Sequence, residues 1–314
     1  MKKAAVIPAQ GIGDALLMLI TSYNLHEAGY HVTTFQPILE ELEPWLKTKQ
    51  FAPIPDDQDL TEVLSSFDLV ILQNDNSERS RQLIQLRKTG KIKHLIVFYP
   101  TYQFHKHGSL TKKDYPFEPE KSMVENIAKA TARLLKLAGV SRNNGMLPLP
   151  GLVHRKNSRR IVFHPTSKDC HKNWPKKKFL ILAHKLQKQG YEIVFAVSTS
   201  ERDQWQGTHG STYLLPDLNS LSELAKLIFE SKCIIGNDSL VGHLASNLQI
   251  PSLIIANDKR RMRLWRPDWL KSELVTPPKI ALKWLPNKFK KKYWGHLISV
   301  NRVLSRFKKI EKRI

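Results

Sequence analysis

Three short polar segments, far apart in the chain, carry the residues with which this sequence could do chemistry. They are "PAQGIGDALL" (8–17), "FHPTSKDCHKNWPKKKF" (163–179) and "GNDSLVGHLAS" (236–246). Each one stands where an apolar, strand-like run passes into a helical pattern. Polar groups at the carboxyl ends of parallel strands are typical of ligand sites in α/β proteins.

The first segment combines two glycines with an acid. Gly11 and Gly13 allow a tight turn and close approach of a ligand to the backbone, and Asp14 begins the next helix. Asp14 has two interpretations that the segment alone does not separate. It is either a cap or first-turn acid favoured by the helix dipole, or a functional carboxylate. A dinucleotide fingerprint is excluded, because Leu16 stands where G-x-G-x-x-G needs its third glycine.

The second segment offers donors for an anion. Thr166 and Ser167 leave the strand, Lys172 follows, and Trp174-Pro175 opens a helix. Hydroxyls, a lysine and a helix N-terminus suit a diphosphate. The alternative is a basic surface loop in which Trp174 is a hydrophobic staple.

A metal site is the other interpretation of this segment. His164, Cys170 and His171 are all potential ligands. A fourth ligand at a suitable spacing is missing, so we predict no metal.

The third segment places an acid, a hydroxyl and an imidazole around a helix start. Asp238 or Ser239 caps the helix, and its first amides would face an anion. An Asp aimed at a phosphate would repel it, so Asp238 is expected to hold amides or to accept hydrogen bonds from sugar hydroxyls. His243, one turn later, is either a packed helical histidine or a ligand residue.

The elements that must position these segments alternate between strand and helix in both halves. Apolar runs at 3–9, 31–36, 67–73, 94–100 and 159–165 are separated by helical patterns such as 14–29, 77–90 and 121–139. This alternation predicts an α/β protein with parallel sheets. A segment without periodicity (140–158) separates a domain at 1–150 from one at 159–285. Residues 286–314 form a third, basic segment with apolar residues at helical spacing.

The charge of the chain is unusual and limits its partners. The net charge is +22, and residues 279–314 alone contribute +11, from twelve basic residues and one acid. Such a balance favours nucleic acid, an acidic membrane face or an anionic substrate. Two distant cysteines make no disulfide framework, and polar residues interrupt the apolar start, so we expect a cytoplasmic protein without a signal peptide or membrane span.

Taken together, the three segments suit transfer of a group from an activated donor. If the two domains face each other, a carboxylate lies opposite a phosphate-and-hydroxyl site and can act as general base. At this point the chain resembles glycosyltransferase family 9, the bacterial heptosyltransferases of lipopolysaccharide core synthesis. "GIGDALL" is similar to the family's N-terminal G-D turn, "HPTSKDCHKNWP" to its H-x-T-T…K-x-W-P element, and "GNDSLVGHLAS" to its D-[ST]-G-x-x-H-L-A element.

The resemblance implies a GT-B fold, with two Rossmann-like domains facing a central cleft, and an inverting transfer without metal or other cofactor. Asp14 would be the catalytic base, and Gly11 and Gly13 would form the turn beside it. The residues that would bind the donor, with ADP-heptose the expected nucleotide sugar, are Thr166, Ser167, Lys172, Asp238, Ser239 and His243. Two features depart from the family pattern: Leu240 replaces a glycine, and "ANDKRRMRLWRPDW" (256–269) stands where relatives have a Gly-Pro turn.

The resemblance also implies partners. The acceptor would be the anionic, lipid-linked inner core, which would place the protein as a monomer on the cytoplasmic face of the inner membrane. Basic candidates for binding this acceptor in the N-terminal domain are Arg79, Arg81, Lys106, Lys112 and Lys113. The basic C-terminal helix would bury its apolar face on the protein, and packing on the N-terminal domain is one option. Two alternatives stay open: a non-catalytic relative that binds nucleotide sugars, and a basic nucleic-acid-binding protein, although no recognition module accompanies the charge.

Overall fold

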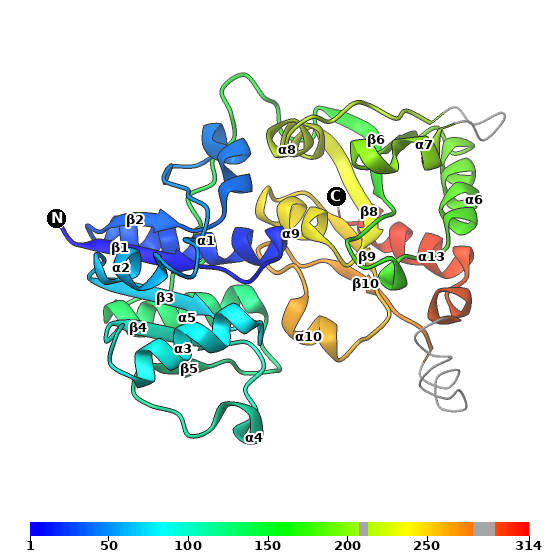
Figure 1. Ribbon diagram of the computed structural model, residues 1–314. Coiled ribbons are helices and arrows are strands. Elements are labelled where there is room, and N and C mark those ends of the chain that lie inside the picture. Colours follow the sequence, from blue (N-terminus) through cyan, green and yellow to red (C-terminus); the bar gives the residue numbers. More distant parts are fainter. Residues whose placement is uncertain (207–212, 279–292, 314) are drawn as a thin grey trace. The chain divides into compact units, whose positions relative to one another are not determined.

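The computed structural model describes residues 1–206, 213–278 and 293–313 (Figure 1). The chain divides into two compact units. The N-terminal unit comprises Met1–Leu147 and Arg263–Trp265, and the C-terminal unit comprises Pro148–Met262 and Arg266–Ile314. The sequence predicts a boundary between residues 150 and 159, and the observed division lies at Leu147–Pro148. Residues 286–292 of the predicted third segment lie outside the described residues.

The N-terminal unit alternates strands and helices, as the apolar runs predict. Its elements are β1 (Lys3–Ile7), α1 (Ile12–Glu27), β2 (His31–Thr34), the 3₁₀ helix η1 (Pro37–Trp45), α2 (Leu60–Ser65), β3 (Leu69–Gln73), α3 (Glu78–Lys88), β4 (Leu95–Tyr99), α4 (Phe104–His107), β5 (Asp114–Pro116) and α5 (Met123–Leu135).

The five strands of this unit form one parallel sheet in the order β2-β1-β3-β4-β5. The central strands are buried along almost their whole length, which explains why they are apolar at successive positions and not at alternate ones. Leu60, Leu64 and Leu83 of α2 and α3 pack on one face, while α1 and α5 pack together and α1 lies against β1 and β2. The chain passes from β1 to β2 on one side and then returns to place β3 on the other. The switch point of the sheet therefore lies between β1 and β3.

The C-terminal unit repeats this plan. Its elements are β6 (Asn157–His164), η2 (Cys170–Lys172), α6 (Lys176–Gln187), β7 (Glu192–Phe195), η3 (Thr199–Glu201), α7 (Arg202–Trp205), α8 (Leu221–Phe229), β8 (Ser231–Asn237), α9 (Leu240–Asn247), β9 (Ser252–Ile255), β10 (Glu273–Val275), η4 (Trp294–Leu297) and α13 (Val300–Glu311). Helix α10 (Arg261–Trp265) begins in this unit, and its last three residues, Arg263–Trp265, belong to the N-terminal unit.

The second sheet is also parallel, with the order β10-β9-β8-β6-β7. Helices α6 and α13 cover one face, and α8 and α9 cover the other (Figure 1). Because β7 and β8 lie on opposite sides of β6, the switch point of this sheet is between β6 and β8.

Helix α13 belongs to the core of the C-terminal unit. Val303, Phe307 and Ile310 are buried in the same cluster as strands β6 to β10, and the helix lies against β9, β10 and α6. The sequence alone leaves open whether this helix packs on the N-terminal domain. The structure buries the apolar face of this helix on its own unit, and Arg306 and Arg313 pair with Glu273 of β10 at 3.7 and 2.6 Å.

The polar segment 101–120 is more ordered than its composition predicts. It holds the short helix α4 and the edge strand β5, which pairs with β4. The Arg87 guanidinium lies 2.8 Å from the Asp114 carboxylate of β5, and both side chains are buried. Three residues with no alternation of apolar and polar side chains give no recognisable strand signal, so the sequence interpretation missed β5.

Two expectations about the chain as a whole concern thiols and membrane spans. Cys170 is exposed and Cys233 is buried, and both are free thiols. Within the described ranges, every helix is too short or too polar to cross a bilayer.

Candidate active site

Asp14 lies at the switch point of the N-terminal sheet, in the first turn of α1 directly after β1. Gln73, the last residue of β3, donates from Nε2 to Asp14 Oδ1 at 2.8 Å. Gln73 is fully buried, and its Oε1 accepts from the Ala9 amide at 3.2 Å. Since that contact fixes which end of the amide is the donor, the carboxylate of Asp14 is held in a defined orientation.

The two glycines of this turn have different roles. Helix α1 begins at Ile12, two residues before the predicted start, so Gly13 lies inside the first turn and Gly11 is the N-cap. The N-cap interpretation of Asp14 is therefore wrong, and it is a first-turn acid. A Cβ on Gly11 would lie 2.6 Å from Asp14 Oδ2, so any larger residue at this position would displace the carboxylate.

A second carboxylate braces the same turn. Burial alone would raise the pKa of Asp75, but hydrogen bonds from the Ser77 and Ser80 side chains and from the Ser77 and Gln10 amides outweigh it, and the pKa is lowered. Since Asp75 follows β3 and Gln10 follows β1, this contact ties the two loops of the switch point together.

Asn237, at the polar end of β8, connects this strand to the loop that follows β6. Its side chain is buried, Oδ1 accepts from the Trp174 amide at 3.0 Å, and Nδ2 donates to the Pro165 carbonyl at 2.6 Å. One amide side chain thus clamps both ends of the loop 165–174 to β8. Trp174 itself packs edge-on against Phe179 with ring centroids 5.0 Å apart. Because these residues flank the start of α6 at the N′ and N4 positions, Trp174 is the predicted hydrophobic staple.

Thr166 and Ser167 lie in this clamped loop. Thr166 Oγ1 donates to Glu201 Oε2 at 3.0 Å, and Ser167 Oγ donates to Asn173 Oδ1 at 2.7 Å. Sequence reasoning missed Glu201, which follows β7 at the carboxyl edge of the sheet. The available signal was the capping box Ser198-Thr-Ser-Glu201, in which the Glu carboxylate also accepts from the Ser198 amide.

Asp238 is the meeting point of two cations. Lys172 Nζ lies 3.8 Å and Arg261 Nε 3.5 Å from the same oxygen, Asp238 Oδ2. Lys172 comes from the loop after β6, Asp238 from the end of β8, and Arg261 from the segment after β9. The sheet places these three strands side by side, so the contact gathers residues that are distant in the sequence.

Ser239 and His243 lie on one side of the start of α9. Ser239 is its N-cap residue, but its hydroxyl makes no cap hydrogen bond. Among the described residues, Ser239 Oγ and His243 Nδ1 are buried atoms without a hydrogen-bond partner, and such atoms are often found at functional sites. Burial lowers the pKa of His243 to about 4, although the nearby Asp238 opposes the shift. The imidazole is therefore neutral at physiological pH.

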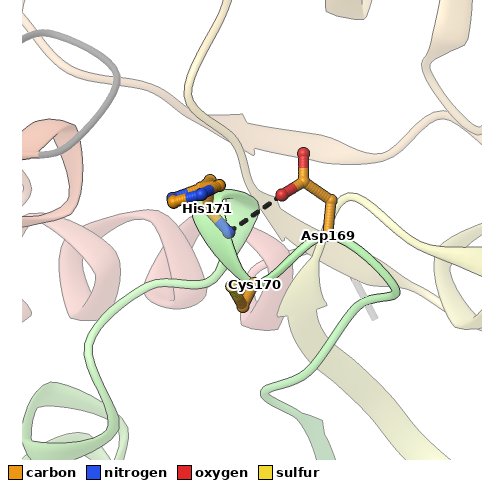
Figure 2. A group of neighbouring side chains, drawn as sticks. All are labelled: Asp169, Cys170 and His171. Carbon is orange, nitrogen blue, oxygen red and sulfur yellow. Dashed lines mark hydrogen bonds between the residues drawn. The ribbon is translucent and has the colours of Figure 1, made fainter. Parts of the chain in front are cut away.

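The potential metal ligands of the second segment do not gather as a closed site. His164 is half-buried, with its ring Nδ1 2.7 Å from the Ala196 carbonyl oxygen, and desolvation of the ring lowers its pKa. Figure 2 shows the group that the structure does form, the consecutive residues Asp169, Cys170 and His171. All three are exposed, their ligand atoms lie within 4.8 Å of one another, and Asp169 Oδ1 already accepts from the His171 amide. A tetrahedral structural site needs four ligands, so we assign no metal to this turn.

The basic residues predicted for the acceptor lie around β3, β4 and β5 in the N-terminal unit. Arg79 is 3.2 Å from Asp57 and donates to the Pro55 carbonyl, and Arg81 donates to the Asn76 carbonyl. Lys113 Nζ contacts the Lys93 carbonyl, while Lys106 and Lys112 are exposed. Arg79 is half-buried and supports a local loop, whereas Arg81 and the three lysines are exposed.

Each unit therefore carries polar groups at the switch point of a parallel sheet: Asp14 in one, and Lys172, Asp238 and Ser239 in the other. Two such α/β units in tandem are the architecture of GT-B glycosyltransferases.

Comparison with known proteins agrees with this class. Residues 105–267, more than half of the chain, match glycosyltransferase family 9 (heptosyltransferase). The chain belongs to that family. No curated protein sequence gives a significant match.

Solved structures with the same fold cover nearly the whole chain. A glycosyl transferase family 9 protein from Veillonella parvula is 17% identical, with a TM-score of 0.71 over 100% of this chain and 98% of that one. The ADP-heptose lipopolysaccharide heptosyltransferase II of E. coli is 17% identical, with a TM-score of 0.70 over 100% and 99%. The E. coli heptosyltransferase WaaC with ADP is 14% identical, with a TM-score of 0.65 over 98% and 99%.

Proposed function

We propose that the chain is an inverting, metal-independent glycosyltransferase that moves a heptose from a nucleoside diphosphate sugar, ADP-heptose, to the inner core of lipopolysaccharide. The family membership supports a glycosyltransferase of heptosyl type. The nucleotide follows from two relatives whose names include ADP-heptose or bound ADP.

Asp14 is the general base of the proposed reaction. Its carboxylate takes the proton of the acceptor hydroxyl while that oxygen forms a bond to the anomeric carbon of the donor. The bond from this carbon to the diphosphate oxygen breaks, and the electron pair leaves with the nucleoside diphosphate. A single displacement of this kind inverts the anomeric carbon. The hydrogen bond from Gln73 keeps the carboxylate in place without neutralising it.

The C-terminal unit binds the donor. Lys172 and the first amides of α9 stabilise the negative charge that grows on the departing diphosphate. Thr166, Ser167, Ser239 and His243 supply hydroxyls and a neutral imidazole to the same ligand. Glu201, which accepts from Thr166, supports that loop.

The observation that carries the proposal is the gathering of Lys172 and Asp238 at the N-terminus of α9, at the switch point of the sheet. An amide-rich helix end beside a lysine is suited to a diphosphate, and ligands of α/β proteins bind at switch points.

Replacement of Asp14 tests the reaction. Asp14→Asn keeps an oxygen that can accept from Gln73, so the turn should stay folded. We expect turnover to fall by about 10²–10⁴-fold, with the affinity for ADP within about twofold of the wild type. The readout is ADP release from ADP-heptose with a Kdo-bearing lipid acceptor, together with ADP binding by calorimetry. The exposed Asp59, changed to Asn, is the matched control.

The outcomes separate the alternatives. Equal loss of turnover and of ADP binding would make Asp14 a structural residue. A wild type that binds ADP but transfers no sugar to any core acceptor would be a non-catalytic relative, and the proposed activity would be wrong.

We further propose that the protein works as a monomer on the cytoplasmic face of the inner membrane, where the anionic acceptor lies. The proposed acceptor-binding residues are Arg79, Arg81, Lys106, Lys112 and Lys113. The exposed Lys308 and Lys309 of α13, and Lys312 directly after it, would attract anionic lipid, at about 1 kcal/mol each near the surface.

The membrane contact needs a test that leaves the fold intact. Deleting α13 would remove buried Val303 and Phe307 from the core, so surface substitutions are cleaner. Changing Lys308, Lys309 and Lys312 to Gln should weaken binding to phosphatidylglycerol vesicles by about tenfold or more. The same change at the exposed Lys2, Lys88 and Lys91 is the control, and equal effects of both triple variants would contradict a role for α13.

A further inference from the structure

Arg261 lies beside the donor-binding groups but belongs to none of the three sequence motifs. It is the first residue of α10, after β9, and its Nε is 3.5 Å from Asp238 Oδ2. Lys172 Nζ is 3.8 Å from the same oxygen. Two cations thus converge on one carboxylate.

The backbone holds Arg261 in this position. Asp258 Oδ1 accepts from the Arg260 amide at 2.7 Å and from the Arg261 amide at 3.4 Å. The Met262 amide donates to the Asp258 carbonyl at 3.2 Å, and the Met262 side chain is buried. The turn that presents Arg261 is therefore capped at its start and anchored on the next residue.

Two cationic side chains therefore lie beside the N-terminus of α9, where the helix dipole adds positive potential. Both contacts to Asp238 are longer than a tight ion pair, and the side chains of Lys172 and Arg261 are 25% and 42% exposed. An anion could therefore approach both cations from the solvent side.

We propose that Arg261 is a second cationic ligand for the diphosphate of the donor, and that Asp238 acts as a positioning residue that holds Lys172 and Arg261 at one point. The inference rests on the proposed function, since it names a further residue of the same donor site. A guanidinium has five N–H donors in a planar fork, so it can contact a carboxylate and a phosphate together. Lysine and arginine on two sides of the diphosphate would share the charge of the leaving group.

The number of phosphates in the ligand tests this role. Arg261→Gln removes the charge but keeps a hydrogen-bonding side chain, and the adjacent, exposed Arg260→Gln removes the same charge one residue away. Calorimetry with ADP, UDP and GDP, and with the corresponding monophosphates, gives the affinities. For the best diphosphate, Arg261→Gln should raise the Kd by about tenfold, with a much smaller change for the monophosphate. Arg260→Gln should leave both affinities close to those of the wild type.

Two further readouts sharpen the result. Arg261→Lys should recover part of the lost affinity, and the salt dependence of diphosphate binding should weaken in Arg261→Gln. A diphosphate Kd for Arg261→Gln that equals the value for the wild type or for Arg260→Gln would overturn the assignment while leaving the proposed function standing. A wild type that binds none of the nucleoside diphosphates would overturn the proposed function, and the role of Arg261 with it.

Discussion

Replacing His243 with glutamine should remove a large part of the pH dependence of the stability of the C-terminal unit. The imidazole is only 5% exposed, and burial lowers its pKa to about 4. In the unfolded chain the ring titrates near its ordinary value of about 6.5. Between these two values the unfolded chain binds a proton that the folded chain does not. The unfolding free energy therefore has its full value above about pH 6.5 and decreases as the pH falls towards 4, because protonation favours the unfolded chain.

The size of the effect follows from the two pKa values. At pH 5 the unfolded histidine is almost fully protonated and the folded one is not, which costs the wild type about 2 kcal/mol of unfolding free energy relative to pH 8. The loss approaches about 3 kcal/mol below pH 4. His243→Gln cannot take up this proton. The difference in unfolding free energy between the wild type and this variant should therefore be about 2 kcal/mol smaller at pH 5 than at pH 8.

Urea unfolding at the two pH values provides the measurement. Trp174 and Trp205 are buried in the C-terminal unit, and Trp45 in the N-terminal unit. All proteins therefore carry Trp45→Phe, so that the change in tryptophan fluorescence mainly reports unfolding of the C-terminal unit. The exposed His171, changed to Gln, is the control and should follow the wild type at both pH values. If His243→Gln and the wild type lose the same free energy between pH 8 and pH 5, the imidazole is not held neutral by burial and the reasoning is wrong.

Two other predictions concern the framework of the site. Gly236→Ala should destabilise the C-terminal unit by about 1–3 kcal/mol and weaken ADP binding. The new Cβ would lie 2.7 Å from the His164 carbonyl oxygen and push β8 away from β6. An unchanged melting temperature and ADP affinity would contradict this prediction. Asp114→Asn should lower the unfolding free energy of the N-terminal unit, measured in urea, by about 3 kcal/mol or more, because it leaves the buried Arg87 guanidinium without its counter-ion. Asp217→Asn is the control. It breaks an exposed pair with Arg202 and should lower the unfolding free energy by about 1 kcal/mol or less.

The strands and helices around the site could be predicted because they leave periodic signals. The runs before Asp14, Thr166 and Asp238 all proved to be strands followed by a turn and a helical element, with boundaries shifted by a few residues. Because both faces of a parallel sheet are buried, each strand is a nearly continuous apolar run, and such a run can be recognised in the local sequence.

The contacts that complete the site could not be predicted, because they depend on strand order. Gln73 reaches Asp14 only because β3 lies next to β1, and Arg261 reaches Asp238 only because β9 lies next to β8. Alternating strands and helices fix the parallel direction but not which strands are neighbours. Gln73 was hidden at the end of an apolar strand, and Arg261 in a run of basic residues that resembles a solvated surface.

The surroundings of the two site carboxylates explain why they are assigned different roles. Asp14 receives a hydrogen bond from a neutral amide, which orients it without supplying a positive charge. Asp238 has two cations within 4 Å of one oxygen, so its carboxylate is placed to hold Lys172 and Arg261. A general base must point at the proton that it accepts, and the hydrogen bond from Gln73 fixes the orientation of the Asp14 carboxylate. The carboxylate between Lys172 and Arg261 is better suited to holding cations where an anionic leaving group departs.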